Sequence, residues 1–253
     1  MRAAARPARL VHMLNSFLVL HIAAGSVSLA SMFVPMLTKK GGQAHRKSGW
    51  IFVAGMTVVS ITAFVLAGAR AVLDPSVQGR RAGLFLLYVA LLTAACVSAG
   101  VRVLRARKRA GAHRHPWDVG LPSALLAVSA FALIYGLAVG WTLLAAFSLI
   151  GFLTGGSQLR YWLRPPAHHM HWWFEHMTAM LGACIAATTA FLVVNADRFG
   201  ASTFSLAVWL APTVIGTPTI ALWTAYYRRR FSSARTSRGG TREAQLAAPP
   251  DPA

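Results

Sequence analysis

Long hydrophobic runs alternate with short polar links along most of the chain. Each run has about twenty residues or more, the length that a helix needs to cross the apolar core of a bilayer. The uncharged stretch 119–159 is long enough for two helices, and we divide it at Gly140–Trp141, where a tight turn fits. The predicted helices cover about residues 11–37, 50–69, 82–103, 119–139, 141–162, 174–195 and 204–227. The pattern therefore predicts an all-α, polytopic transmembrane helix bundle of about seven helices.

Three parts of the chain differ in composition. Residues 1–10 form a basic N-terminal segment, residues 11–230 hold the apolar runs, and residues 231–253 are polar and rich in Gly and Pro. The last part lacks the apolar surface that a packed structure needs, so we expect a disordered tail there. The seventh run contains Pro212 and Pro218, which we expect to interrupt its helix.

The charge of the chain is strongly one-sided. It has 25 Lys and Arg against 6 Asp and Glu, a formal net charge of +19, while 56% of its residues are hydrophobic. In a soluble protein this excess would suggest nucleic acid binding, but here the basic residues lie mostly between apolar runs and accompany no nucleic-acid-binding motif. They predict instead contact with a lipid bilayer, with anionic headgroups at its cytoplasmic face.

The distribution of the basic residues also predicts an orientation. Most of them lie in the links after the first, third and fifth runs and in the C-terminal tail. Because cytoplasmic links carry an excess of Lys and Arg, we expect the N-terminus outside and the C-terminus in the cytoplasm. Arg2, Arg6 and Arg9 oppose this orientation, and a start of translation at Met13 instead of Met1 would remove them.

The segment 164–195 gathers candidate chemistry where a polar link meets the sixth apolar run. Its histidines and its carboxylate are His168, His169, His171, His176 and Glu175. A helix that starts near Pro165–Pro166, where missing N–H groups do no harm, would place His171 and Glu175 on one face. Two or three imidazoles with one carboxylate are typical ligands of zinc or non-haem iron. His171, Glu175 and His176 are therefore a candidate metal site.

A second interpretation pairs histidines from different helices. His45 lies in the first link and His176 at the start of the sixth run, on the same predicted side. Imidazoles also serve as axial ligands of haem, so a b-type haem held by these two residues is an alternative to a divalent metal ion. We interpret His113 and His115, in the most basic link, as solvated.

His21 lies well inside the first apolar run. An ionisable group at such depth is costly and marks a candidate functional residue, so His21 is a third candidate for cofactor binding. It lies roughly 24 Å from Leu37, the predicted cytoplasmic end of that helix, at 1.5 Å per residue. This depth predicts a partner of its own, such as a helix carbonyl, Ser26 or Ser28, and not a place beside the other histidines.

One further pattern crosses the first two apolar runs and returns before the sixth. It consists of His21, Gly25, Lys40–Gly41, His45–Arg46, Gly49, Met56 and the later segment E-H-M-T-A-M-L-G-A-C-I-A-A-T-T-A-F-L-V-V-N. This pattern resembles a family of uncharacterised bacterial inner-membrane proteins. The resemblance implies a multi-pass fold and a location in the bacterial inner membrane, and it implies no particular reaction. It points to His21, His45 and His176, which the chemistry of the side chains also favours.

Three functions from different classes fit these residues. The first is a membrane redox protein that holds a haem, and the second is a zinc-dependent membrane hydrolase of ceramidase-like architecture. The third is a carrier or a non-catalytic membrane protein in which His21 couples to protons or the link histidines form an interfacial belt with Trp residues. The sequence leaves open which of them applies, and whether the chain is an enzyme.

Overall fold

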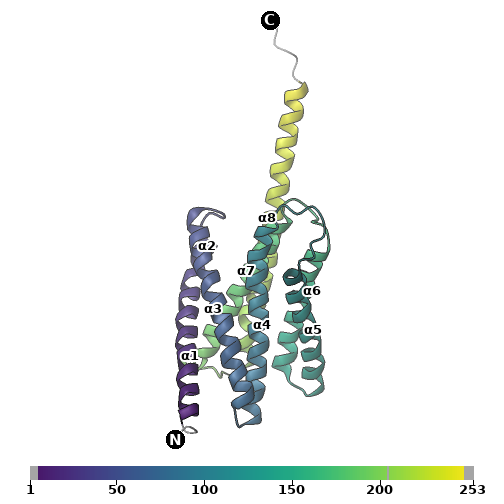
Figure 1. Cartoon of the computed structure of the whole chain (residues 1–253). Helices are drawn as coiled ribbons and strands as arrows, with labels where there is room; N and C mark the ends of the chain where they lie inside the picture. Colours follow the sequence, from purple (N-terminus) through teal and green to yellow (C-terminus); the bar gives the residue numbers. More distant parts are fainter. Residues whose placement is uncertain (1–4, 204, 248–253) are drawn as a thin grey trace. The chain divides into compact units, whose positions relative to one another are not determined.

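The computed structural model describes residues 5–203 and 205–247, and the side chains of residues 9–203 and 205–231. This part of the chain is helical, with no strand in it (Figure 1). Its helices are α1 Ala5–Ser31, α2 Phe33–Leu37, α3 Gln43–Leu73, α4 Val77–Arg105, α5 Pro116–Ala138, α6 Thr142–Leu163, α7 His171–Val194, the 3-10 helix η1 Ala196–Phe199, and α8 Leu206–Ala247. Seven helices here are long and apolar enough to cross a membrane, which confirms the predicted number.

The first apolar run is bent where the sequence pattern predicts one helix. α1 ends at Ser31 and α2 begins at Phe33, and the two together form the first membrane-length element, Arg9–Leu37. Pro35 lies in α2 and has no backbone N–H to donate to the Ser31 carbonyl, so the regular ladder of hydrogen bonds is interrupted here. This break directs the Pro35 and Met36 carbonyls toward the link that follows.

Several helices begin or end further into the polar links than the apolar pattern predicts. α3 begins at Gln43 and α5 at Pro116, whereas the hydrophobic pattern starts at residues 50 and 119. Hydropathy marks only the apolar part of a helix, while capping side chains extend the hydrogen-bonded helix into polar sequence. Ser76 does so for α4, because its Oγ accepts a hydrogen bond of 2.9 Å from the Gly79 N–H.

The last helix also differs from expectation. α8 is helical through Pro212 and Pro218, which we expected to interrupt it, and it continues to Ala247 in the region expected to be a disordered tail. Its final residues, Arg242 to Ala247, are mostly strong helix formers, which offsets the polar composition on which the expectation rested. Residues 248–253 of the predicted tail, and residues 1–4 of the predicted N-terminal segment, lie outside the described residues.

The described helices belong to two compact units, residues 1–212 and 213–253. In the first unit, α3 packs against α1 and α4, α7 packs against α4, and α5 pairs with α6 (Figure 1). The α5–α6 hairpin turns through Gly140, whose φ of +67° is a left-handed conformation that glycine adopts without strain. The second unit is the remainder of α8, in which the Tyr226 and Tyr227 rings contact each other at 5.2 Å.

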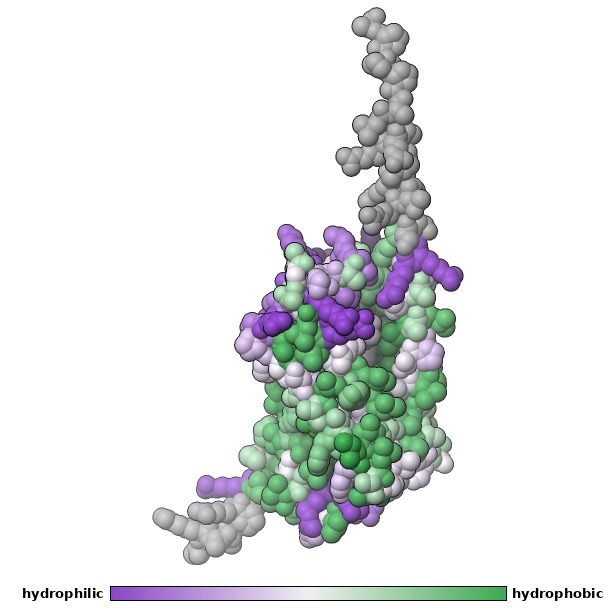
Figure 2. All heavy atoms as spheres, turned by 90° about the vertical axis from the view of Figure 1, so that its right-hand side faces the viewer, coloured by the Kyte–Doolittle hydropathy of each residue, from purple (hydrophilic) through white to green (hydrophobic). Residues whose placement is uncertain are grey.

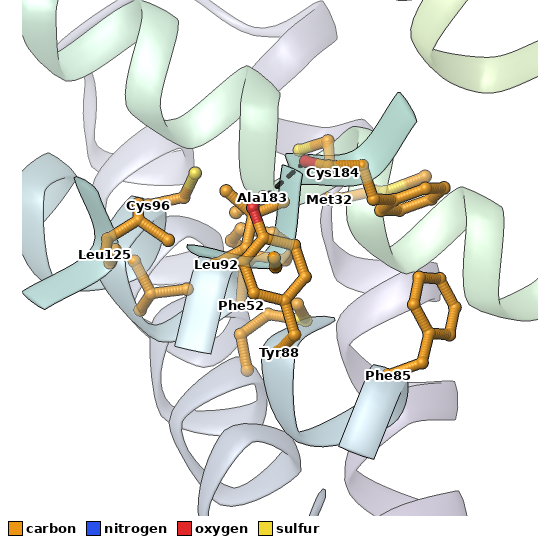
Figure 3. Packing of buried hydrophobic residues seen from close by; sticks show 14 of the residues in the cluster. Met32, Phe52, Phe85, Tyr88, Leu92, Cys96, Leu125, Ala183 and Cys184 are labelled. Carbon is orange, nitrogen blue, oxygen red and sulfur yellow. Dashed lines mark hydrogen bonds between the residues drawn. The ribbon is translucent and has the colours of Figure 1, made fainter. Parts of the chain in front are cut away.

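The core of the first unit is apolar and lies between these helices. Phe52, Phe85, Leu92 and Leu125 are buried in it, together with the Tyr88 ring (Figure 3). The Tyr88 hydroxyl donates a hydrogen bond of 3.0 Å to the carbonyl of Phe147 on α6 and lies 2.9 Å from the Ser129 Oγ on α5. A buried hydroxyl needs such partners, so these contacts fix how the α5–α6 hairpin meets α4.

Many large apolar side chains face outward and not into the core. Val19, Ile22, Phe131, Ile134 and Leu153 are each at least half exposed. Figure 2 shows hydrophobic side chains gathered in a broad middle band, with hydrophilic side chains at its two ends. A soluble monomer rarely exposes an apolar surface of this extent, so the band marks a surface that an apolar environment would cover.

The turn between α3 and α4 predicts a dependence of stability on pH. The Asp74 carboxylate accepts hydrogen bonds from the Ser76 hydroxyl (2.7 Å) and the Ser76 N–H (3.0 Å). These bonds hold the pKa of Asp74 below its ordinary value. The folded chain therefore binds this proton less readily than the unfolded chain, so the stabilisation is present above the ordinary carboxyl pKa and is lost as the pH falls through the folded-state pKa.

We expect the melting temperature in detergent to fall more steeply below about pH 4 in the unmodified protein than in an Asp74→Asn variant, whose side chain does not titrate. Melting curves collected over a pH series would test this. Two parallel pH profiles would contradict it.

Candidate functional site

Three links meet at one end of the first unit and bring together most of the histidines. They join α2 to α3, α4 to α5 and α6 to α7, and they lie at the upper end in Figure 1. The candidate residues occupy the links themselves or the adjoining turns of helix. This end holds two separate groups of side chains, one around His45 and His176 and one around Asp118.

His45 is held by the link that precedes it. It lies in the first turn of α3, where its Nδ1 donates a hydrogen bond of 3.1 Å to the Pro35 carbonyl. Lys40 Nζ donates to the same carbonyl and to that of Met36, both at 2.7 Å, and burial lowers the pKa of Lys40. Gly41 turns the link with a φ of +77°. The unpaired carbonyls at the end of α2 therefore orient the imidazole.

His176 is held in the same way by a different helix. It lies in the second turn of α7 and is half-buried. Its Nδ1 donates a hydrogen bond of 2.7 Å to the Gly100 carbonyl of α4. Since a carbonyl can only accept, both His45 and His176 carry a proton on Nδ1. In this tautomer a metal would be bound through Nε2.

The two imidazoles are neighbours. Their ring centroids are 6.5 Å apart, with an angle of 66° between the ring planes. Neither Nε2 has a hydrogen-bond partner among the side chains that the structure describes. Metal-ligating histidines commonly bind through one nitrogen and donate the other N–H to a backbone carbonyl, which sets both tautomer and ring orientation. The sequence selected both residues, and the structure brings them together in this arrangement.

The second predicted set, His171, Glu175 and His176, has a different arrangement. His171 Nε2 lies 3.6 Å from a Glu175 oxygen, so the expected i,i+4 pair forms. His171 Nδ1 accepts a hydrogen bond of 3.3 Å from the Ala167 N–H, because α7 begins at His171 and not near Pro165–Pro166. Both ring nitrogens of His171 are therefore engaged within the protein. Among the described residues, no three His, Cys, Asp or Glu side chains converge on a point where they could hold a metal ion.

His21 stands apart from these groups, as its depth predicts. Its Nδ1 lies 2.8 Å from the Thr62 Oγ1 of α3. The Thr62 hydroxyl donates to the Val58 carbonyl at 2.8 Å, so it accepts from His21. The partner is thus a buried threonine of the neighbouring helix, and not Ser26 or Ser28. The contact ties α1 to α3 within the apolar part of the bundle.

A buried carboxylate that the sequence did not reveal forms the other group at this end. Asp118 lies in the first turn of α5, and only 2% of its side chain is exposed. The Arg102 guanidinium of α4 binds it through two nitrogens, with the Nη2–Oδ2 distance 2.8 Å. The His113 Nε2 lies 2.9 Å from the same Oδ2. His113 was predicted to be solvated, and 36% of its side chain is exposed, but its ring also contacts this buried carboxylate, which the sequence did not predict.

His115 is exposed, as predicted, and it also belongs to this group as the N-cap of α5. Its Nδ1 accepts hydrogen bonds of 3.2 Å from the Trp117 N–H and from Arg102. Its ring stacks on that of His113, with centroids 6.2 Å apart and planes 6° from parallel. In the sequence, the only signal for this group is an aspartate two residues after a proline, which suits the first turn of a helix.

The Asp118 group is suited to structure and not to chemistry. Its single negative charge is balanced by Arg102, and its hydrogen bonds join α4, α5 and the link between them. The backbone N–H of His113 also donates a hydrogen bond of 2.8 Å to the Trp162 carbonyl, which fixes the α4–α5 link to the end of α6. By contrast, His45 and His176 retain free nitrogens, so they are the better candidates for binding a cofactor.

In comparisons with known proteins, no family model, no curated protein and no solved structure matched the chain.

Proposed function

We propose that this chain is a multi-pass membrane protein that holds a b-type haem between His45 and His176 and takes part in electron transfer at the membrane. The observation that carries the proposal is the pair of adjacent imidazoles. Each has its Nδ1 fixed to a carbonyl of another helix and its Nε2 available.

The surface of the helices supports a membrane location. Seven helices among the described residues have the length and composition to span a bilayer, and large apolar side chains such as Val19, Phe131 and Ile134 face outward. The excess of Lys and Arg in alternate links supports an orientation with the His45–His176 end in the cytoplasm and the N-terminus outside. The pattern of His21, Lys40–Gly41 and His45–Arg46 further suggests a bacterial inner membrane.

The spacing of the rings fits two axial ligands. An imidazole nitrogen lies about 2 Å from a bound metal, and adding the distance from nitrogen to ring centre on both sides gives a centroid separation of about 6 Å. The observed separation is 6.5 Å. The two Nδ1 hydrogen bonds hold the rings at an angle of 66° to each other.

The number of available ligands favours haem over zinc. A catalytic zinc site takes three ligands from the protein, and no such group of three is found among the described residues. A haem brings four nitrogens of its own and requires only axial ligands from the chain. Two half-buried imidazoles on neighbouring helices meet that smaller requirement, which is why the redox function is preferred to the hydrolase.

The chain's own residues would fix the ligands and adjust their basicity. A haem in this position would supply one-electron chemistry. The Pro35 and Gly100 carbonyls hold the two Nδ1 protons, which strengthens each Nε2 as a donor of electron density. Lys40 holds the end of α2 in place by binding the same carbonyl as His45.

Absorption spectroscopy tests the proposal directly. The protein, expressed with added haem precursor and purified in detergent, should show a Soret band and sharpened visible bands after reduction. In both His45→Ala and His176→Ala the haem content should fall by more than about tenfold. Metal affinity falls on this scale when a side chain that supports the site is removed. His169→Ala, from the same histidine-rich segment, should keep its haem. A wild-type protein without a Soret band would remove the proposal.

A further inference from the structure

A basic pocket lies at the same end of the first unit, away from the proposed haem ligands. It has a volume of about 470 Å³ and is bounded by the link after α4, the end of α6 and the link before α7. Its principal polar lining residues are Arg107, Lys108, Arg109, His168 and His169. Tyr161 and Trp172 add aromatic surface to it. The volume is in the range of pockets that bind small molecules.

Arg109 is built into the floor of this pocket. Its guanidinium donates to the carbonyls of Gly111 (3.0 Å), Arg164 (2.8 Å) and Tyr161 (2.6 Å), and it lies 4.2 Å from the centre of the Tyr161 ring. These contacts hold the charge in place but do not neutralise it. Its Nε is buried and has no hydrogen-bond partner among the described residues.

No acidic residue of the described chain lines the pocket. Glu175, the carboxylate of the adjoining helix, is engaged with His171 at 3.6 Å. Asp118 is occupied by Arg102 and His113. The fixed Arg109 and the exposed Arg107 and Lys108 therefore share one concave surface, and no carboxylate among its described lining residues balances them. Such a surface attracts an anion of complementary size.

We propose that this pocket binds a phosphate group, carried by the headgroup of an anionic lipid or by a phosphate compound in solution. Arg109 contributes a fixed positive charge, because its Nη atoms already donate to three carbonyls, and the exposed Arg107 and Lys108 offer donors for phosphate oxygens at the rim. The Trp172 ring suits the boundary between headgroups and acyl chains. Basic pockets between helices on the cytoplasmic side are typical sites for anionic headgroups. This site is independent of the haem.

A charge-matched pair of variants tests the proposal. Arg107→Gln/Lys108→Gln removes two positive charges from the rim, where neither side chain makes a hydrogen bond that supports the fold. Arg46→Gln/Lys47→Gln removes two charges from exposed residues at the start of α3 that do not line the pocket. Binding of phosphatidylglycerol and of phosphatidylcholine to the detergent-purified proteins is measured by native mass spectrometry. Inorganic phosphate is added in a parallel series of melting curves.

We expect phosphatidylglycerol to bind more tightly than phosphatidylcholine, and the Arg107→Gln/Lys108→Gln variant to bind it about tenfold more weakly. The control variant should bind as the unmodified protein does. A second outcome would also support the site. The protein shows no preference for phosphatidylglycerol over phosphatidylcholine, but inorganic phosphate raises the melting temperature of the unmodified protein and the control variant and not that of Arg107→Gln/Lys108→Gln. The site then binds phosphate from solution. Equal losses in the two double variants, or no binding of either probe, would overturn the proposal.

Discussion

Replacing Asp118 with alanine is expected to destabilise the folded chain by about 2–4 kcal/mol. Removing one partner of a buried ion pair typically costs about 3–5 kcal/mol, because the other charge is left without compensation. We expect a loss below this typical range because 24% of the Arg102 side chain is exposed, so the guanidinium can turn partly toward water. The His113 ring also loses its acceptor, and with it one attachment of the α4–α5 link.

Melting curves of the detergent-purified protein would measure this effect. Asp197→Ala is the matched control, since Asp197 is exposed and, within the described part of the chain, its carboxylate accepts a single long hydrogen bond of 3.5 Å, from Thr203. A second variant, Arg102→Met/Asp118→Leu, replaces the pair with apolar side chains and should recover part of the lost stability. If Asp118→Ala melted at the same temperature as the control, the carboxylate would have no structural role.

Replacing Gly83 is expected to force α3 and α4 apart. A Cβ at this position would overlap the Ala71 backbone and the Ala67 carbonyl, and backbone atoms cannot turn aside as a flexible side chain does. Adding volume to a packed interface costs about 1–3 kcal/mol, and sometimes more. Gly83→Ala regains about 1 kcal/mol from its better helix propensity, so Gly83→Leu is the variant with the larger expected loss.

Gly120→Ala provides the comparison for this second experiment. It lies in α5, and a Cβ there would meet no atom within 4 Å. Only the gain in helix propensity remains, so this variant should melt at the same or a higher temperature than the unmodified protein. Gly83→Leu should melt well below both. Similar melting of Gly83→Leu and Gly120→Ala would mean that the two helices are not in close contact.

The number of helices could be predicted from the sequence because the apolar runs report directly on length and composition. The ends of the helices could not be predicted, because they depend on individual caps. The Ser76 hydroxyl and the His115 ring both lie in polar sequence that hydropathy assigns to links. The break between α1 and α2 follows from Pro35. Hydropathy does not show this break, because the residues around Pro35 are apolar on both sides.

The candidate site was predictable in part. His45 and His176 were selected because both lie beside apolar runs on the same predicted side, and the alternation of links places those two ends together. His171 was also selected, but the 3.3 Å bond from the Ala167 N–H to its Nδ1 depends on where α7 starts. The contact between Arg102 and Asp118 depends on the path of the α4–α5 link, which has no periodic signal.

The anchors of His45 and His176 are main-chain oxygens, contributed by Pro35 and Gly100. Substituting either residue leaves its carbonyl in the chain, so the anchors respond only to a shift of the helices that carry them. Alanine would cause such a shift at both positions, because a Cβ at Gly100 would overlap the Met180 side chain of α7, and alanine in place of Pro35 would restore the missing N–H. The orientation of the two imidazoles therefore reports the spacing of the helices, and a distant variant that changes this spacing should alter the absorption spectrum of the proposed haem without touching either histidine.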